Sequence, residues 1–394
     1  MTDVMRPESE GEAANMIRRA CVDGVKLDIR GGDTRGGLGR PRTAKLGLSS
    51  SALAGVVFYA PAEMTICARA GTTLSALEAA IAEHNHILPF EPMRPQALWG
   101  APGEPTVGGM VATGHSGPRR VTAGAVRDGV LGLRVINGLG ETIRCGGRVM
   151  KNVTGLDLTK LNCGAHGTLG FLTEATIKLT PRPEREQTLA VVGVDEAGAM
   201  DAMTRALGSP FGVSAAAWLP KGVGGDSSRT LLRIEGFEDS VSYRSRRLTG
   251  LLAEFGEILT LAGADSSSLW RAIRDAKFIA EPRDRAVWRI GLAPSQAHPF
   301  IRRLGDTALA HFFDLGGGLV WLATAESQDV ATKVRRVLAL FGGHARLMRA
   351  GDELRKSVAV FQPLSDVELR LSRGLKASFD PGGVLNFGRM YPGM

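Results

Sequence analysis

Residues 30–40 read Arg-Gly-Gly-Asp-Thr-Arg-Gly-Gly-Leu-Gly-Arg and directly follow a short apolar segment, residues 25–29, that predicts a β-strand. Backbone N–H groups reach the oxygens of a pyrophosphate only where no Cβ stands in the way. Two further glycine clusters follow, at Gly108, Gly109, Gly114 and Gly117, and at Gly164, Gly167 and Gly170. Three clusters beside predicted strand or helix ends favour a phosphate-bearing ligand held by main chain, with a set of tight turns as the alternative.

The composition is unusual in its glycine content. Glycine makes up 51 of 394 residues, about 13% against roughly 7% in average proteins, and no low-complexity segment accounts for the excess. The net charge of +8 comes from scattered basic residues accompanied by only three tyrosines. The stacking platform of a single-stranded nucleic-acid binder is therefore missing, and we expect no nucleic-acid partner.

Four cysteines lie far apart, at Cys21, Cys67, Cys145 and Cys163, with no C-x-x-C motif. This spacing argues against an iron–sulfur cluster or structural zinc site built by this chain alone, and favours free thiols in a reducing compartment. The N-terminal segment is acidic, without the apolar core of a signal peptide. No apolar run approaches the roughly 18 residues of a membrane span. The sequence predicts a cytoplasmic protein without direct membrane insertion.

The order of predicted elements indicates an α+β protein. In its first part we expect helices over 10–23, 73–85 and 157–162, and strands over 25–29, 55–59, 65–69, 130–136, 141–144 and 171–179. Pro181 and Pro183 then interrupt regular structure, and we place a domain boundary there. The predicted domains are residues 1–183 and 184–375, followed by a tail, 376–394, that returns to the first.

The second domain is predicted to carry helices on an antiparallel sheet. Its expected strands are 189–194, 213–219, 231–236, 287–292 and 318–323, and its expected helices are 196–207, 239–255, 295–304 and 328–341. The segment 380–389 contains too many glycines and prolines for either.

None of the glycine clusters matches a common nucleotide fingerprint. The chain has no G-x-x-x-x-G-K-[ST], which excludes a P-loop, and no G-x-G-x-x-G after a predicted strand, which argues against an ordinary Rossmann NAD site.

Several longer motifs resemble the vanillyl-alcohol-oxidase/PCMH family of FAD proteins. They are Tyr59-Ala-Pro-Ala-Glu-Met64, Leu88-Pro-Phe-Glu-Pro92, Thr106-Val-Gly-Gly-Met-Val-Ala112, Ser116-Gly-Pro-Arg-Arg120 and Arg127-Asp-Gly-Val-Leu-Gly132. Further motifs resemble one branch of that family, the E-type subunits of bacterial glycolate oxidases: Val149-Met-Lys-Asn-Val-Thr-Gly-Leu-Asp-Leu158, Gly167-Thr-Leu-Gly170 and Lys178-Leu-Thr-Pro-Arg-Pro183. The resemblance is specific over 25–185, diffuse over 186–375, and returns in the tail.

The resemblance implies a PCMH-type FAD-binding domain of two α/β subdomains, followed by a ferredoxin-like α+β cap domain. It places the FAD pyrophosphate on residues 31–35, the isoalloxazine along the second glycine cluster, and the adenosine end on residues 167–172. The residues implied to bind FAD are Gly31, Gly32, Asp33, Thr34, Arg35, Thr106, Val107, Gly108, Gly109, Thr113, Gly114, Ser116, Gly117, Arg120, Gly167, Thr168, Gly170 and Leu172. Arg120 and Lys151 are candidate charge partners for a phosphate or the flavin N1–C2=O end, with an ordinary ion pair as the alternative.

Two positions of the first loop depart from the family pattern. Asp33 stands where many relatives have Gly or Asn, and a carboxylate is unfavourable beside a diphosphate. We expect its side chain to turn away or to pair with a cation such as Arg35. At Thr34, covalent members of the family carry the histidine that links to the flavin. Threonine cannot form that bond, so the FAD is expected to be non-covalent.

A histidine cluster typical of catalytic relatives is missing. Those relatives carry a late His-x-Gly-Asp-Gly-Asn-x-His type motif that binds a metal or takes the proton of the substrate. The corresponding region here contains only His344, while His298 and His311 stand isolated. We therefore predict no metal site and assign no catalytic residue. His115 has a credible place near the flavin ring, although a packing role is favoured.

The resemblance implies the FAD-binding subunit of a glycolate oxidase complex that converts glycolate to glyoxylate. A D-type flavoprotein subunit would carry the main site for the small 2-hydroxy acid. An F-type subunit would pass electrons through iron–sulfur clusters towards quinone, and these partners could hold the chain peripherally at the inner membrane. Two alternatives stay open. One is a self-sufficient FAD-dependent 2-hydroxy-acid dehydrogenase that clamps the carboxylate with Arg127, Arg283, Arg285 or Arg289. The other is a structural subunit that has lost its flavin.

Overall fold

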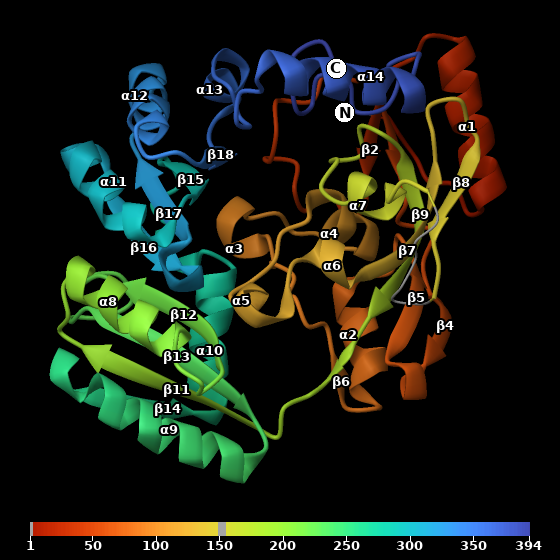
Figure 1. Cartoon of the computed structure of the whole chain (residues 1–394). Coiled ribbons are helices and arrows are strands. Elements are labelled where there is room, and N and C mark those ends of the chain that lie inside the picture. Colours follow the sequence, from red (N-terminus) through yellow and green to blue (C-terminus); the bar gives the residue numbers. More distant parts are fainter. Residues whose placement is uncertain (1–2, 149–154) are drawn as a thin grey trace.

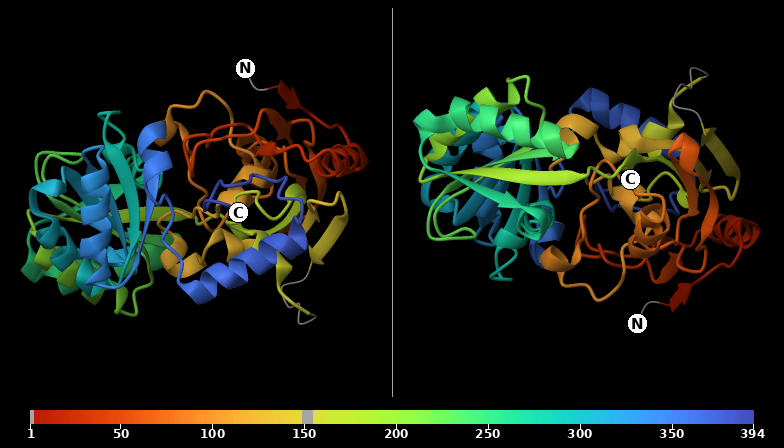
Figure 2. Two further views of the ribbon diagram at one scale, coloured as in Figure 1. Left: turned by 90° about the horizontal axis from the view of Figure 1, so that it is seen from above. Right: turned by 90° about the horizontal axis from the view of Figure 1, so that it is seen from below.

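The computed structural model describes residues 3–148 and 155–394, which form two α+β domains lying side by side (Figures 1 and 2). The first domain contains a parallel sheet of order β1-β3-β2 and an antiparallel sheet of order β4-β5-β9-β7-β8. Its strands are β1 (Asp3–Met5), β2 (Leu27–Arg30), β3 (Leu46–Ser49), β4 (Val56–Ala60), β5 (Thr65–Arg69), β7 (Val130–Ile136), β8 (Thr142–Gly146) and β9 (Phe171–Lys178). A short pair, β6 (His86–Ile87) and β10 (Thr180–Pro181), precedes the cap.

The longer helices of the first domain pack apolar faces on these sheets. The helices are α1 (Glu10–Val22), α2 (Leu74–Ala82), α3 (Gln96–Trp99), α4 (Val107–Thr113), α5 (Arg120–Ala123), α6 (Val126–Gly129) and α7 (Leu158–Asn162). Helix α4 is not among the helices expected from the sequence, because its segment is rich in glycine. Val107, Met110 and Val111 nevertheless recur at helical spacing and are all buried in the core under the antiparallel sheet. Thr106 caps this helix by accepting a hydrogen bond from the Gly109 N–H.

The cap domain is built on one antiparallel sheet of eight strands, ordered β14-β11-β13-β12-β16-β17-β15-β18. Its strands are β11 (Arg185–Val192), β12 (Val213–Leu219), β13 (Arg229–Gly236), β14 (Ile258–Ala262), β15 (Ala286–Gly291), β16 (Ala310–Asp314), β17 (Leu319–Thr324) and β18 (His344–Arg349). Its helices are α8 (Glu196–Leu207), α9 (Glu238–Leu252), α10 (Gly263–Arg274), α11 (Ala297–Leu304) and α12 (Gln328–Ala339). The α+β architecture is the one that the sequence predicts.

The cap contains the ferredoxin-like pattern twice. The order β11-α8-β12-β13-α9-β14 is repeated by β15-α11-β16-β17-α12-β18, and the two halves meet where Trp218 of β12 pairs with Phe313 of β16. One face of the sheet is covered by α8, α9, α11 and α12. The other face packs on α10 and on Leu38, Met93 and Leu98 of the first domain. This second face is therefore the one that can contribute side chains to a site between the domains.

The chain returns to the first domain through α13 (Asp352–Ser357) and α14 (Asp366–Phe379), so the predicted boundary at 375/376 falls inside a helix (Figure 1). Buried Lys376 donates hydrogen bonds to the Thr168 carbonyl at 2.7 Å, the Leu385 carbonyl at 2.8 Å and Asp380 Oδ2 at 2.6 Å. Asp380 in turn accepts from the backbone N–H of Val384. Within the part of the chain described, no helix has both the length and the apolar character needed to cross a bilayer.

Replacing Lys376 with methionine should destabilise the protein by about 3 kcal/mol, because it leaves the Asp380 carboxylate buried without its cation. Urea unfolding followed by far-UV circular dichroism measures the change. Arg373→Met, on an exposed position of the same helix, serves as the control and should stay within about 0.5 kcal/mol of the parent protein. Equal stability of the Lys376 variant and this control would show that the buried pair of Lys376 and Asp380 does not stabilise the protein.

Candidate functional site

A cavity in the first domain is lined by all three glycine clusters and by the C-terminal tail. It is open to solvent on one side, and its empty space, counted together with that opening, is about 770 Å³. Most of the residues predicted to bind FAD line it: Gly31, Gly32, Asp33, Thr34, Arg35, Thr106, Gly108, Gly109, Thr113, Gly167, Gly170 and Leu172. The structure thus brings together segments that lie more than 100 residues apart in the sequence.

The remaining predicted residues do not line this cavity; they are Val107, Gly114, Ser116, Gly117, Arg120 and Thr168. Two of them hold the surrounding loops in place. The Ser116 hydroxyl accepts a hydrogen bond from the Val126 N–H at 2.9 Å, and the Thr168 hydroxyl donates to the Ala165 carbonyl at 2.7 Å. Lys151 lies outside the described residues.

The first glycine loop is pressed against the segment that leads into α4. A Cβ on Gly31 would overlap the Thr106 hydroxyl, and a Cβ on Gly32 would overlap the carbonyl oxygen of Glu104. Only glycine therefore permits this backbone-to-backbone contact. Within the described chain, the N–H groups of residues 31–35 donate to no protein acceptor. With Asp33 at a φ of 54°, this run of unused N–H groups forms an anion-binding concavity suited to a diphosphate.

Charged side chains surround this loop. The expectation that Asp33 pairs with a cation is confirmed, but its partners are Arg30 at 3.1 Å and Arg42 at 2.5 Å rather than Arg35. Arg35 instead donates to the Met93 carbonyl at 3.0 Å, and its Nε is buried without an acceptor. Burial and the charge of Arg94 lower the pKa of Arg35 to about 10. An incompletely satisfied buried cation that lines the cavity fits a bound phosphate.

The C-terminal tail completes the cavity with two residues that the sequence analysis did not select. Arg389 donates to the carbonyl oxygens of Arg40 at 2.6 Å and Gly36 at 3.0 Å, so it holds the first glycine loop in shape. Asn386 accepts from the Ile29 N–H and donates to the His166 carbonyl, both at 2.7 Å. The resemblance of segment 380–389 to the family was the one signal that pointed to the tail.

His166 is a further lining residue that the sequence analysis missed, although it stands inside the third glycine cluster. It adopts a φ of 54°, and its Nε2 is buried without a hydrogen-bond partner among the described residues. Its ring meets Phe361 edge-on, with centroids 4.9 Å apart. Burial, followed by the nearby charge of Arg346, lowers its pKa well below the usual value. His166 is therefore a neutral side chain at physiological pH.

A second group of buried cations lies on the cap face that is turned to the first domain. Arg289 of β15 pairs in register with Trp321 of β17 and with Arg346 of β18, so the three side chains share one face. Trp321 belongs to the apolar cluster shared with the first domain, which fixes the direction of that face. Burial, and then mutual repulsion with Arg346, lowers the pKa of Arg289 to about 9, and burial lowers that of Arg346 to about 10.

His115 connects this group to the second glycine cluster. Its Nε2 lies 3.0 Å from Arg346 Nη1 and must accept, because a guanidinium can only donate. Its proton is then on Nδ1, which is buried without a partner in the described structure. Burial and the charges of Arg346 and Arg289 lower the pKa of His115 well below the usual value. His115 is therefore neutral, and Arg346 and Arg289 supply the positive charge around it.

The other histidines lie elsewhere. The description of His298 and His311 as isolated is wrong, because both contact Glu196, at 2.5 Å and 2.6 Å. Helix α11 and strand β16 bring them together on α8, away from the cavity, a contact that sequence spacing does not reveal. The hydrogen bonds from the two histidines outweigh burial and lower the pKa of Glu196. Among the described residues, no group of His, Cys, Asp and Glu has the arrangement of a metal site.

Gly32→Ala should abolish retention of a flavin, because the added Cβ overlaps the Glu104 carbonyl and pushes the first loop away from α4. The measurement is FAD released per purified chain, from absorbance after denaturation. Gly11→Ala is the control, since nothing lies within 4 Å of a Cβ at that position. Full flavin retention in the Gly32 variant would contradict the role of the close contact.

Comparisons with known proteins agree with this geometry. Residues 2–146 match the family described as "FAD binding domain". The chain is 37% identical to glycolate oxidase subunit GlcE of Escherichia coli (strain K12) over 379 residues, which cover 95% of both chains. It is 27% identical to the uncharacterized FAD-linked oxidoreductase Rv2280 of Mycobacterium tuberculosis (strain ATCC 25618 / H37Rv), over 98% of this chain and 90% of that protein.

Solved structures share the fold. A 4-ethylphenol oxidase from Gulosibacter chungangensis superposes with a TM-score of 0.74 at 16% identity, covering 99% of this chain and 89% of that one. An alkyldihydroxyacetonephosphate synthase superposes with a TM-score of 0.74 at 15% identity, over 97% and 75%. The 37% identity to GlcE, which extends over 95% of both chains, decides the family. The chain belongs to the FAD-binding oxidoreductase family that includes glycolate oxidase subunit GlcE, and FAD is its cofactor.

Proposed function

We propose that this chain is the FAD-binding subunit of a complex that oxidises glycolate to glyoxylate and passes the electrons through an iron–sulfur subunit towards quinone. The observation that carries the proposal is the cavity built from residues 31–35, the start of α4 and the tail, in a chain similar to GlcE over nearly its whole length. Bound there, FAD would serve as an electron relay or accessory centre within the complex. The N–H groups of residues 31–35 and Arg35 would hold its diphosphate without a covalent bond.

A division of labour between chains fits the residues present. The four cysteines are free, so under this proposal the iron–sulfur clusters belong to an F-type partner. The chain is also 46% identical, over 84 residues, to glycolate oxidase subunit GlcD of Bacillus subtilis (strain 168), a relative of the proposed D-type partner. In that arrangement the D-type subunit carries the main 2-hydroxy-acid site. The complex would lie in the cytoplasm or peripherally at the inner membrane.

Purification of a tagged chain together with its D-type and F-type partners tests the proposal. We expect one complex that contains all three proteins, with one FAD on this chain, and glycolate-dependent quinone reduction that is lost when any partner is left out. A chain that purifies alone from cells expressing all three, and that reduces an artificial acceptor with glycolate at an undiminished rate, would contradict it.

One observation favours a second candidate, in which this chain binds a 2-hydroxy acid itself. Arg289 and Arg346 lie side by side and largely buried, and in the described structure neither forms a salt bridge, although the charge of buried Asp314 acts on Arg289. Two largely desolvated cations that form no salt bridge are stabilised by a small anion such as a substrate carboxylate. Of the other arginines considered from the sequence, Arg127 and Arg283 lie near Asp128 and Glu281 at more exposed positions.

Arg289→Met should weaken carboxylate binding at least ~10-fold, the usual loss for one charged hydrogen-bonding group. The dissociation constant comes from titrating the FAD-loaded chain with glycolate, or with unreactive oxalate, and following the flavin spectrum. Arg127→Met is the matched control and should leave it unchanged. If neither acid perturbs the flavin of the parent protein, the chain has no carboxylate site of its own.

A further inference from the structure

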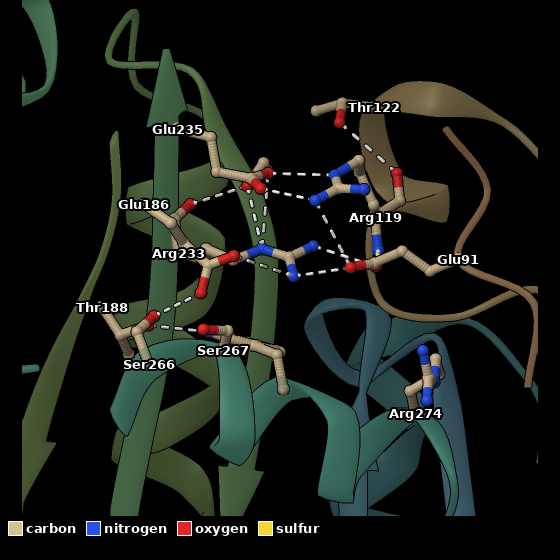
Figure 3. Close-up of polar contacts among 12 residues, drawn as sticks. Glu91, Arg119, Thr122, Glu186, Thr188, Arg233, Glu235, Ser266, Ser267 and Arg274 are labelled. Atoms are coloured by element: carbon tan, nitrogen blue, oxygen red, sulfur yellow. Dashed lines mark hydrogen bonds and ion pairs between the residues drawn. The ribbon is translucent and has the colours of Figure 1, made fainter. Parts of the chain in front are cut away.

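Two arginine–carboxylate pairs cross the interface between the domains (Figure 3). Arg233 of β13 donates from Nη1 to Glu91 Oε1 at 2.8 Å and from Nη2 to Glu91 Oε2 at 3.0 Å. Arg119, directly before α5, donates from Nη2 to Glu235 Oε1 at 2.6 Å and from Nε to Glu235 Oε2 at 3.1 Å. Each domain thus supplies one acid and one base. We call these four residues the interdomain quartet.

The interdomain quartet is largely buried and internally neutral. The side chains of Arg233 and Glu235 are 1% and 8% exposed, and those of Arg119 and Glu91 are 15% and 14% exposed. Burial alone would raise the pKa of Glu91, but Arg233 and Arg119 outweigh it and lower that pKa to about 2. The pKa of Glu235 lies below its usual value because the same two arginines outweigh burial. All four groups are charged at neutral pH, so removing one leaves an uncompensated buried charge.

The interdomain quartet is also attached to the loop that carries His115. The Arg119 N–H donates to Glu91 Oε2 at 2.7 Å, and the Gly117 N–H donates to the Phe90 carbonyl at 3.0 Å. A side chain on Gly117 would press on Glu91, so the loop follows the backbone of residues 90–91 closely. Any shift of Glu91 or Arg119 therefore moves the loop that contains His115.

On the cap side, the interdomain quartet shares its sheet face with the arginine pair described above. Arg233 and Glu235 alternate with residues of the helix-covered side and lie on the same face as Leu231, which packs against the first domain. Arg289 and Arg346 emerge from the same face of the same continuous sheet. The position of this sheet on the first domain determines where Arg346 meets His115.

We propose that Glu91 and Arg119 are positioning residues: through Arg233 and Glu235 they hold the cap sheet so that Arg289 and Arg346 face His115 at the edge of the FAD site. This inference rests on the second candidate function for the part that concerns carboxylate binding. The proposed positioning role does not involve the FAD diphosphate. In the described structure residues 31–35 form no hydrogen bond with the interdomain quartet. Disturbing the quartet should weaken carboxylate binding and leave FAD in place.

Glu235→Gln in the FAD-loaded protein removes one charge with little change in shape, and Arg119→Lys keeps the charge but loses the two-pronged geometry. We expect both to retain one FAD per chain, to raise the oxalate dissociation constant about 10-fold, and to speed hydrogen–deuterium exchange over residues 113–125 but not over 31–35. Glu63→Gln is the control, since Glu63 is exposed in the turn before β5 and belongs to neither pair.

The outcomes separate the two ideas. If the parent protein binds no oxalate, the second candidate function is wrong. The exchange experiment still tests the positioning role in that case. Faster exchange of residues 113–125 in both variants would support that role, and unchanged exchange would overturn it. Variants that lose thermal stability while oxalate affinity and exchange stay at parental values would show the interdomain quartet to be an ordinary stabilising network, which also overturns the proposal.

Discussion

The close approach of the first glycine loop to the segment before α4 is the constraint on which the site depends. A side chain at Gly32 would overlap the Glu104 carbonyl, and one at Gly31 the Thr106 hydroxyl that caps α4. The N–H groups of residues 31–35 donate to no protein acceptor in the described structure, which leaves them available to a ligand. The tail then fixes the outer side of the loop through Arg389. A diphosphate is the ligand that such a surface fits.

Cations without a salt-bridge partner lie at the cavity and on the cap face that is turned to the first domain. Asp33 is neutralised by Arg30 and Arg42, and the interdomain quartet is neutral in itself. Arg35 and the pair Arg289 and Arg346 are different, because burial lowers the pKa of each of them. Buried charges without partners are costly, and a bound anion offsets that cost. The first cation fits the FAD diphosphate, and the pair fits a small carboxylate.

Local pattern was enough for much of the fold. Strands β7 and β12 and helix α8 have the predicted bounds. Other elements lack a clear hydrophobic pattern. Helix α4 contains adjacent glycines, β14 is mostly exposed at the edge of the sheet, and β18 carries His344 and Arg346 on one face. Polar residues at an interdomain site are expected to break the pattern by which strands are recognised.

The binding loops could be predicted because the motifs that form them are short and continuous. Their partners could not, since Asp33 with Arg42, His166 with Asn386, and Glu91 with Arg233 meet only through tertiary folding. The same holds for His298 and His311, which α8 brings together on Glu196. Sequence spacing carries no information about such contacts. It named Arg289 as one of four candidate arginines for carboxylate binding, and it gave no means to choose among the four.

Acid precipitation of the purified chain, with flavin counted separately in the pellet and the supernatant, tests the central claim most directly. The resemblance to the family implies that Thr34 stands where covalent relatives have a histidine, and we expect the cavity to hold FAD by hydrogen bonds and charge. The account predicts about one FAD per chain, all of it in the supernatant. Flavin that stays with the precipitated protein would contradict non-covalent binding, and a chain that takes up no FAD even on reconstitution would contradict the site itself.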